Sequence, residues 1–329
     1  MGEFLLRRLS LSVIILFFVM FMIYLLMYCL PTSYVDVTAR ELATKPGSTK
    51  SAQEWIEELN KQYGFDKGIF GGYFTWLKSA VQGDFGDSWN WTVPVTQKFR
   101  EVIWYSFALA SVAFVLQVCI AIPLGVVAAR KQYSATDYTV TVVSLIGISV
   151  PTFFVATMLK LVFSVKLGWF DVSGMQGRNF LLLSDFGQFL DLCAHLVLPA
   201  ATLTIISIGS LMRYTRTNML EVLGSDYIRT ARAKGLSENR VINYHAFRNT
   251  LIPLITILGG SLPGLFSGAL ITETLFAIRG IGYTSFYSMI SGDIPFTMFY
   301  LTFIAILTLL GNLISDILYA VVDPRVRVH

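Results

Sequence analysis

The stretch LSLSVIILFFVMFMIYLLMYCL, Leu9–Leu30, contains no charged residue over 22 positions. A helix that spans the hydrocarbon core of a bilayer needs about 20 apolar residues, so this run is long enough to cross a membrane. It follows Arg7 and Arg8, as the apolar part of a signal peptide would. However, it is longer than that part usually is, and no small-residue cleavage site follows it. We therefore interpret it as a retained first membrane span.

The remainder of the 329 residues shows the same character. Hydrophobic residues make up 54% of the chain and charged residues only 14%, against about 25% charged residues in soluble domains. Five further apolar runs are candidate spans: Val102–Ala129, Tyr138–Val165, Leu196–Met212, Leu251–Ala277 and Phe296–Ala320. The three cysteines show no CxxC spacing, and we interpret them as small apolar packing residues. The sequence thus predicts an all-α membrane protein with six transmembrane helices.

Positive charges are divided unequally among the segments between the spans. With the N-terminus inside, the largest inner group is the seven cations between Arg213 and Arg248. The two short outer loops hold only Lys166, Arg178 and Arg279. Short cytoplasmic loops carry an excess of Lys and Arg, while long loops weigh little in this rule. The distribution predicts that both termini are cytoplasmic and that the long segment 31–100 lies outside.

Segment 31–100 is predicted to form a small external domain that rests on the membrane. Ser51-Ala52-Gln53-Glu54 is a capping box, in which serine and glutamate satisfy backbone donors at a helix start. Gly64 lies where that helix is expected to end. A second short helix is expected from Tyr73 to Gln82, and Pro94 suits the first turn of the helix that enters the second span.

Helix-breaking residues crowd the fifth span. They are Pro253, Gly259, Gly260, Pro263, Gly264 and Gly268. One interpretation is close helix packing through small residues. The other is that this span lines a pathway, because in lipid such a helix survives only where neighbours or a water-filled cavity satisfy the freed backbone groups. The second interpretation assigns four residues to the translocation pathway: Pro263, Gly264, Gly268 and Glu273.

Motifs of catalysis are absent from the sequence. It holds no G-x-x-x-x-G-K-[ST] phosphate loop, no G-x-S-x-G and no H-E-x-x-H, and its three histidines are far apart. We expect no catalytic residue and no metal site. An ion-coupled secondary transporter stays open as a different class, but such proteins usually need buried ionisable groups and internal repeats. The few candidates, Lys160, Glu273 and Asp316, are more simply explained by helix packing.

The segment DYIRTARAKGLSENR, Asp226–Arg240, interrupts the apolar pattern with four cations and two acids. Tyr227 to Lys234 are mostly good helix formers, and Gly235 can adopt the left-handed conformation that ends a helix. Ser237 is then expected to cap a second helix that runs to about Asn249. By charge alone this segment could simply obey the positive-inside rule or contact anionic lipid. Alternatively, it could dock a soluble partner.

The amino-acid sequence of this segment resembles that of a known family. DYIRTARAKGLSENRVINYHAFRNTLIP is similar to the cytoplasmic loop of permease subunits in the dipeptide and oligopeptide family of ABC importers. Further similar pieces follow in order along the chain: GDFGDSW at Gly83–Trp89, IPLGVVAA at Ile122–Ala129 followed by Asp137, SVPTFF at Ser149–Phe154, LPAATL at Leu198–Leu203, ETLFAIRGIG at Glu273–Gly282, DIP at Asp293–Pro295 and NLISDILYAVVDPRVR at Asn312–Arg327.

The resemblance implies a type I ABC importer permease, the first of two permease partners, in the cell membrane of a prokaryote. Its domains would be 1–30, the external 31–100, a core 101–320 with cytoplasmic loop 213–250, and a tail 321–329. It implies as partners a second permease, two ATP-binding subunits that hold the ATP and magnesium, and an external substrate-binding protein. Peptides are the expected cargo, with nickel chelates or glutathione as alternatives.

The resemblance also assigns residues to the contact with an ATP-binding subunit. They are Asp226, Tyr227, Arg229, Thr230, Ala231, Arg232, Ala233, Lys234, Gly235 and Leu236. Two departures from the family pattern stand out: Arg229 lies where a glutamate is usual in ABC importers, and Arg279 replaces a common proline.

Overall fold

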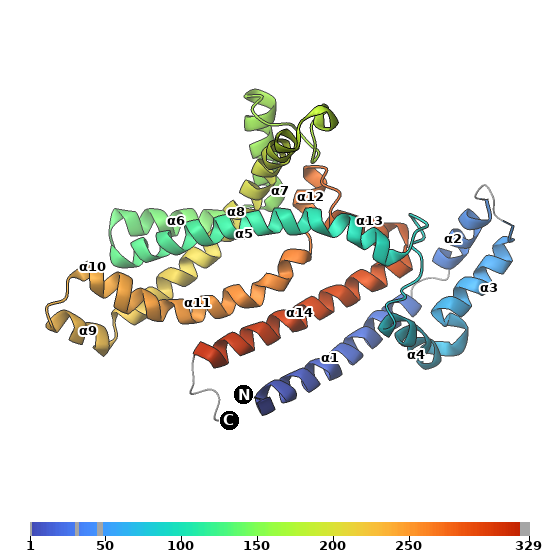
Figure 1. Cartoon of the computed structure of the whole chain (residues 1–329), viewed down its shortest axis with the longest axis horizontal. Coiled ribbons are helices and arrows are strands. Elements are labelled where there is room, and N and C mark those ends of the chain that lie inside the picture. Colours follow the sequence, from blue (N-terminus) through green and yellow to red (C-terminus); the bar gives the residue numbers. More distant parts are fainter. Residues whose placement is uncertain (1, 30–32, 45–48, 323–329) are drawn as a thin grey trace. The chain divides into compact units, whose positions relative to one another are not determined.

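The computed structural model describes residues 2–29, 33–44 and 49–322. Within those ranges all regular structure is helical, apart from an isolated bridge between Asp87 and Pro94. Figure 1 shows these helices in the order of the sequence. The chain divides into two compact units, Met1–Ile103 with Thr284–Leu310 (unit 1) and Trp104–Tyr283 with Gly311–His329 (unit 2).

Unit 1 is built on the first membrane helix. It contains α1 (Gly2–Tyr28), α2 (Ser33–Thr44), α3 (Ala52–Tyr63), η1 (Phe65–Lys67), α4 (Gly68–Val81), the start of α5 (Val95–Arg130), most of α13 (Ile281–Ser291) and the first half of α14 (Ile294–Val322). Tyr24 of α1, Tyr73 and Trp76 of α4, and Met298 of α14 are buried in one cluster. The Tyr73 hydroxyl donates to the carbonyl of Phe17 at 2.8 Å. The segment between the first two spans therefore shares a core with α1 and α14.

The expected caps in this segment are confirmed. The side chain of Ser51 accepts from the Glu54 backbone while Glu54 accepts from Ser51, and Gly64 ends α3 with φ +70°. The predicted start of the second helix at Tyr73 is wrong, since α4 begins at Gly68. Gly72 lies inside α4, where a Cβ would collide with the Tyr24 side chain. The helix needs a glycine there for close approach to α1.

A buried carboxylate joins this segment to the start of α14. The Ser88 hydroxyl donates to Asp293 Oδ2 at 2.5 Å, and the Phe296 N–H donates to Oδ1 at 3.2 Å. Burial raises the pKa of the Asp293 carboxyl, while these hydrogen bonds act in the opposite direction. Asp293 thus ties segment 31–100 to the last span.

Unit 2 contains the remaining helices. They are the rest of α5, α6 (Ala135–Ser149), α7 (Thr152–Leu159), the π-helix η2 (Lys160–Lys166), η3 (Phe180–Leu182), α8 (Asp185–Leu223), α9 (Asp226–Ala233), α10 (Glu238–Arg240), the π-helix η4 (Val241–Ala246), α11 (Phe247–Ser261), η5 (Leu262–Phe266), α12 (Leu270–Leu275) and the end of α14. Close packing of α6 on α8 puts the carbonyl of Ile205 only 3.0 Å from where a Cβ at Gly147 would lie. Small residues therefore set the spacing of this pair.

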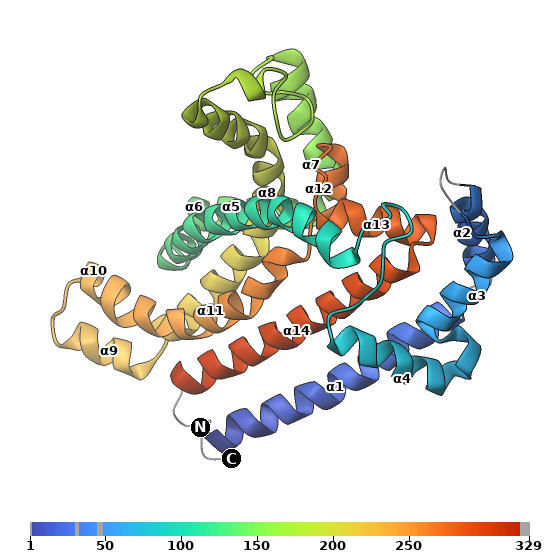
Figure 2. The ribbon, with the colours of Figure 1, turned by 45° about the vertical axis from the view of Figure 1, so that its right-hand side comes forward.

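Five helices of the described chain are long and apolar enough to cross a membrane, and one bent pair could be a sixth span. The five are Leu6–Tyr28, Val95–Arg130, Asp185–Leu223, Glu238–Phe266 and Ile294–Val321. The third predicted span is not one straight helix, because α6 and α7 meet at 102° (Figure 2). Pro151 explains the bend. It lacks an N–H and forces Val150 out of the helical region, to φ −81° and ψ 128°.

The fifth span also differs from its prediction. The helix that begins after Ser237 does not end near Asn249 but continues through η4 into α11 and η5. It stops at Phe266 rather than reaching Ala277. Gly268, with φ +83°, then turns the chain into the separate helix α12. Glycine takes positive φ readily, so this position ends the span.

Candidate functional site

The charged segment 226–236 forms a helical hairpin at the end of α8. Gly224 caps α8, α9 runs from Asp226 to Ala233, and α10 begins after Ser237. The reversal occurs at Gly235, whose φ is +74° and whose N–H donates to the carbonyl of Arg232 at 2.9 Å. The prediction of a short helix, a glycine turn and a second helix is confirmed. Ser237 holds the N-cap position as expected, although its side chain makes no capping hydrogen bond.

The structure sorts the ten assigned residues by face. Ile228, which the assignment left out, is fully buried, and Ala231 is only 8% exposed. Both pack into a cluster with Met219, Val241, Ile242 and Ala246 under the hairpin. Leu236 is half-buried against the same cluster. The exposed set is Asp226, Tyr227, Arg229, Thr230, Arg232, Ala233, Lys234 and Gly235. Ala231 therefore anchors α9 to the rest of unit 2 and offers little surface to a partner.

An ion pair bridges the two arms of the hairpin. Arg232 Nη2 lies 2.8 Å from Glu238 Oε1, and Arg232 Nε lies 3.2 Å from Oε2. These side-chain hydrogen bonds raise the pKa of the Arg232 guanidinium above its ordinary value. The Arg229–Asp226 pair is longer, at 3.4 Å, and highly exposed, so it contributes little. The Arg232–Glu238 contact was not predicted from the sequence, although the two residues flank Gly235.

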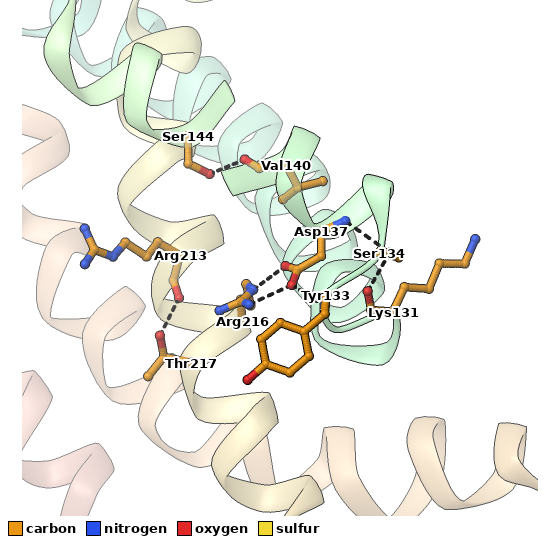
Figure 3. Close-up of polar contacts among 9 residues, drawn as sticks. All are labelled: Lys131, Tyr133, Ser134, Asp137, Val140, Ser144, Arg213, Arg216 and Thr217. Atoms are coloured by element: carbon orange, nitrogen blue, oxygen red, sulfur yellow. Dashed lines mark hydrogen bonds and ion pairs between the residues drawn. The ribbon is translucent and has the colours of Figure 1, made fainter. Parts of the chain in front are cut away.

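A second ion pair joins the N-terminal end of α6 to the C-terminal part of α8 (Figure 3). Arg216 holds Asp137 with two hydrogen bonds, Nε to Oδ1 at 2.5 Å and Nη2 to Oδ2 at 2.8 Å. The Tyr133 N–H adds a third at 2.9 Å. The Asp137 side chain is only 3% exposed and that of Arg216 24%. A bidentate contact of this kind has a strict geometry, so it sets the register of the two helices beside the hairpin.

Glu273 is held by the loop that follows it. Its carboxylate accepts from the Ser106 hydroxyl at 2.6 Å and from the N–H groups of Ala269 and Tyr283 at 2.9 and 2.8 Å. The side chain is fully buried in unit 2. Lys160 donates to the carbonyl of Leu275 at 2.5 Å. Both ionisable groups thus have hydrogen-bond partners within unit 2.

The other fifth-span residues fall into separate environments. Gly259 and Gly260 face α14, where a Cβ at Gly260 would lie 3.1 Å from Ser315. Close helix packing therefore explains these two glycines. Pro263 is buried, and a Cβ at Gly268 would lie 2.6 Å from the Cα of Gly282. Gly264 is different, because it is exposed and a Cβ there would meet nothing within 4 Å.

The residues described hold no group of three or more His, Cys, Asp or Glu side chains placed to bind a metal ion. The fold and the site define a helical membrane protein with several candidate spans and a charged, solvent-exposed hairpin between two of them. Residues 121–328 match the family described as "Binding-protein-dependent transport system inner membrane component". Residues 1–95 match the N-terminal family of the same transport systems. The chain belongs to this family of inner-membrane transport components, and its helices fit the type I ABC permease fold.

Named relatives cover nearly the whole chain. The Bacillus subtilis oligopeptide transport system permease protein AppB is 40% identical over 279 residues, 84% of this chain and 87% of that protein. The dipeptide transport system permease protein DppB of Escherichia coli K12 is 33% identical over 343 residues and covers 99% of both chains. The di/tripeptide permease protein DppB of Pseudomonas aeruginosa is 35% identical over 340 residues, again covering 99% of both.

Proposed function

We propose that this chain is the transmembrane permease subunit of an ATP-driven ABC importer that moves dipeptides or oligopeptides into the cytoplasm. The observation that carries the proposal is the full-length similarity to permeases named for dipeptide, di/tripeptide and oligopeptide transport. That similarity favours peptides over the nickel chelates and glutathione left open by the sequence. In this role the chain forms the pathway with a second permease and has no catalytic residue of its own.

The hairpin 226–236 supports coupling to ATP-binding subunits. Its buried side, with Ile228 and Ala231, packs against the rest of unit 2, while its charged side is exposed to solvent. Such a hairpin can dock in a groove of a soluble partner and transmit movement to α8 and α11, which leave its two ends. ATP and magnesium would be held by the partners. Closure of these subunits would then move the spans as rigid bodies between inward-facing and outward-facing states.

Arg229 replaces the glutamate usual at this position in ABC importers. It points into solvent with its side chain 73% exposed. The negative charge at this end of α9 is supplied instead by Asp226, in the first turn of the helix, where an acid interacts favourably with the helix dipole. We infer that docking uses Asp226 and the exposed helix end.

The orientation has a direct test. Both termini and the hairpin are proposed to be cytoplasmic, and segment 31–100 external, with an external substrate-binding protein delivering cargo. Ser51 and Ser237 are both exposed, so cysteines introduced there in a background without the three native cysteines should react with a maleimide. We expect an impermeant maleimide to label Ser51→Cys from outside and Ser237→Cys only after the inner face is opened. Outside labelling of both positions would contradict the orientation.

The subunit composition is tested by purification of the intact complex from native membranes and mass identification of its partners. We expect a second permease and two ATP-binding subunits. A chain that purifies alone and transports with an ion gradient would support the secondary transporter instead. The engagement of Glu273 and Lys160 in structural hydrogen bonds argues against that class.

A further inference from the structure

A cavity of about 290 Å³ lies between α6 and α8 in unit 2. Its lining consists of Val140, Thr141, Ser144 and Leu145 from α6, and of Met212, Arg213, Arg216 and Thr217 from α8. Figure 3 shows several of these side chains beside the Asp137–Arg216 pair. None of the assignments made for the transport reaction uses this cavity.

The two helices are fastened on either side of the cavity. At the inner end, the bidentate Arg216–Asp137 pair joins them. About two turns further along α6, Gly209 of α8 lies against the carbonyl of Ser144 so closely that a Cβ would not fit. Behind the cavity, α5 approaches α8, with the carbonyl of Met212 only 2.7 Å from where a Cβ at Gly125 would lie. The cavity is therefore built into the helix packing, and its floor at Val140 and Met212 belongs to a buried apolar cluster.

Two cations, Arg213 and Arg216, are among the residues that line this cavity. Arg216 is neutralised by Asp137. Arg213 is exposed, and no carboxylate lies within ion-pair distance of its guanidinium among the residues that the structure describes. In Figure 3 the Arg213 side chain extends away from the Asp137–Arg216 pair. A cation without a partner beside an apolar floor favours a ligand that carries one anionic group next to an apolar part.

The surroundings of the cavity favour a lipid over a soluble anion. Leu145, on its rim, is 46% exposed, and the adjacent α6 residues Val142 and Ile146 are 53% and 56% exposed. This apolar face could seat an acyl chain. Arg213 lies one helical turn from Arg216, which pairs with the first turn of α6, so the cation is close to one membrane surface. In the proposed orientation this is the cytoplasmic surface, where basic pockets between membrane helices bind acidic lipid headgroups.

We propose that the cavity between α6 and α8 binds an anionic phospholipid of the inner leaflet. Arg213 contacts the headgroup phosphate, and the exposed face of α6 receives an acyl chain. A bound lipid would fill the space between the two helices, and so would stabilise the inner part of α6 beside the hairpin. The placement of this lipid in the inner leaflet rests on the proposed orientation of the chain. It depends on neither the transported substrate nor the energy source of transport.

The test uses the intact complex in phosphatidylcholine vesicles with a photoactivatable phosphatidylglycerol. Labelled peptides are mapped by mass spectrometry, and unlabelled phosphatidylglycerol competes for the site. We expect labelling on α6 and α8, and an apparent affinity about five-fold lower in Arg213→Gln, the factor that corresponds to about 1 kcal/mol for one cation near an anionic surface. Arg213→Lys keeps the charge and should retain most of the affinity. Arg248→Gln removes an equally exposed cation of the adjacent helix α11, outside the cavity, and should leave the affinity unchanged.

Several outcomes would overturn the proposal. Unchanged labelling of the α6 and α8 peptides in Arg213→Gln, at equal assembly of the complex, would exclude Arg213 as the headgroup contact. Displacement of the probe by inorganic phosphate at the same concentration as by lipid would identify a soluble-anion site. If Arg213→Gln instead raises KM for a peptide with a free C-terminus but not for its amide, with lipid labelling unchanged, the cavity binds cargo. Because labelling requires no transport, failure here leaves the importer function standing.

Discussion

Gly235 is the residue at which a small backbone change should separate coupling from folding. Its φ of +74° lies in the left-handed region, and a Cβ added there would meet no atom within 4 Å. The cost of a side chain is therefore backbone strain alone, without a steric clash inside the chain. For an ordinary L-residue the left-handed conformation costs about 1–2 kcal/mol, and for a β-branched residue such as valine about 1–3 kcal/mol.

This strain energy is small compared with the free energy gained by burying several apolar spans in the membrane. It is large compared with the stability of a hairpin whose first helix has eight residues. If the strain is relieved by a shift of α9, the docked arrangement loses about five-fold or more in population, since about 1.4 kcal/mol corresponds to a factor of ten. We expect Gly235→Val to reach the membrane and to pair with the second permease normally. ATP-dependent peptide uptake in proteoliposomes, and stimulation of ATP hydrolysis by loaded binding protein, should both fall by about that factor.

Two controls make the result specific. Gly235→Asn should retain most activity, because asparagine tolerates the left-handed region. Gly224 lies at the start of the hairpin with φ −80°, and a Cβ there would have its nearest contact at 3.5 Å, so Gly224→Ala should behave as wild type. Wild-type uptake and stimulation in Gly235→Val, at equal reconstituted protein, would refute the coupling role of this turn. A role in lipid contact alone would predict that result, because all cations remain.

Three further predictions concern Gly268, Gly264 and Arg216. Gly268→Ala should lower the amount of assembled protein, because the residue has positive φ and its Cβ would lie 2.6 Å from the Cα of Gly282. Gly264 has open space around it, so as a pathway residue its change to tryptophan should permit assembly but abolish peptide uptake. Normal uptake in Gly264→Trp would exclude Gly264 from the pathway. Arg216→Gln should destabilise the complex by no more than about 5 kcal/mol, because it leaves the Asp137 carboxylate buried without its partner. The double variant that also carries Asp137→Asn should regain part of the lost stability. Thermal unfolding in detergent measures the stability of the Arg216→Gln variant and of the double variant. Equal stability of the two would argue against a stabilising role of the Arg216–Asp137 ion pair.

Local features were predictable from the sequence where one residue type determines the conformation. The capping box at Ser51 and the positive φ of Gly64 and Gly235 all follow from short-range chemistry. Five of the six predicted apolar spans followed from their length, and the other is the bent pair of α6 and α7. The assignment of the chain to peptide permeases came from the resemblance rather than from such patterns, and the matching families and named relatives confirmed it.

Other features depend on contacts between distant residues and could not be predicted. Membrane helices often tolerate proline, so the apolar run that contains Pro151 gave no sign of a 102° bend. Arg216 and Asp137 are 79 positions apart, and nothing in the local sequence joins them. The burial of Ala231 follows from its place in the cluster with Met219. The spacing of three residues between Ile228 and Ala231 does place both on one face of a helix, so the sequence carries a signal for their shared burial.

The central claim is that the chain carries peptides with energy from ATP. It is tested most directly by uptake of a labelled dipeptide and a labelled oligopeptide into proteoliposomes that contain the purified complex and its binding protein, with no ion gradient across the membrane. We predict uptake that requires ATP and magnesium on the side of the ATP-binding subunits and that persists when ionophores dissipate all gradients. Uptake that proceeds without ATP and stops with an ionophore, or transport of nickel chelates or glutathione with no peptide uptake, would contradict the account.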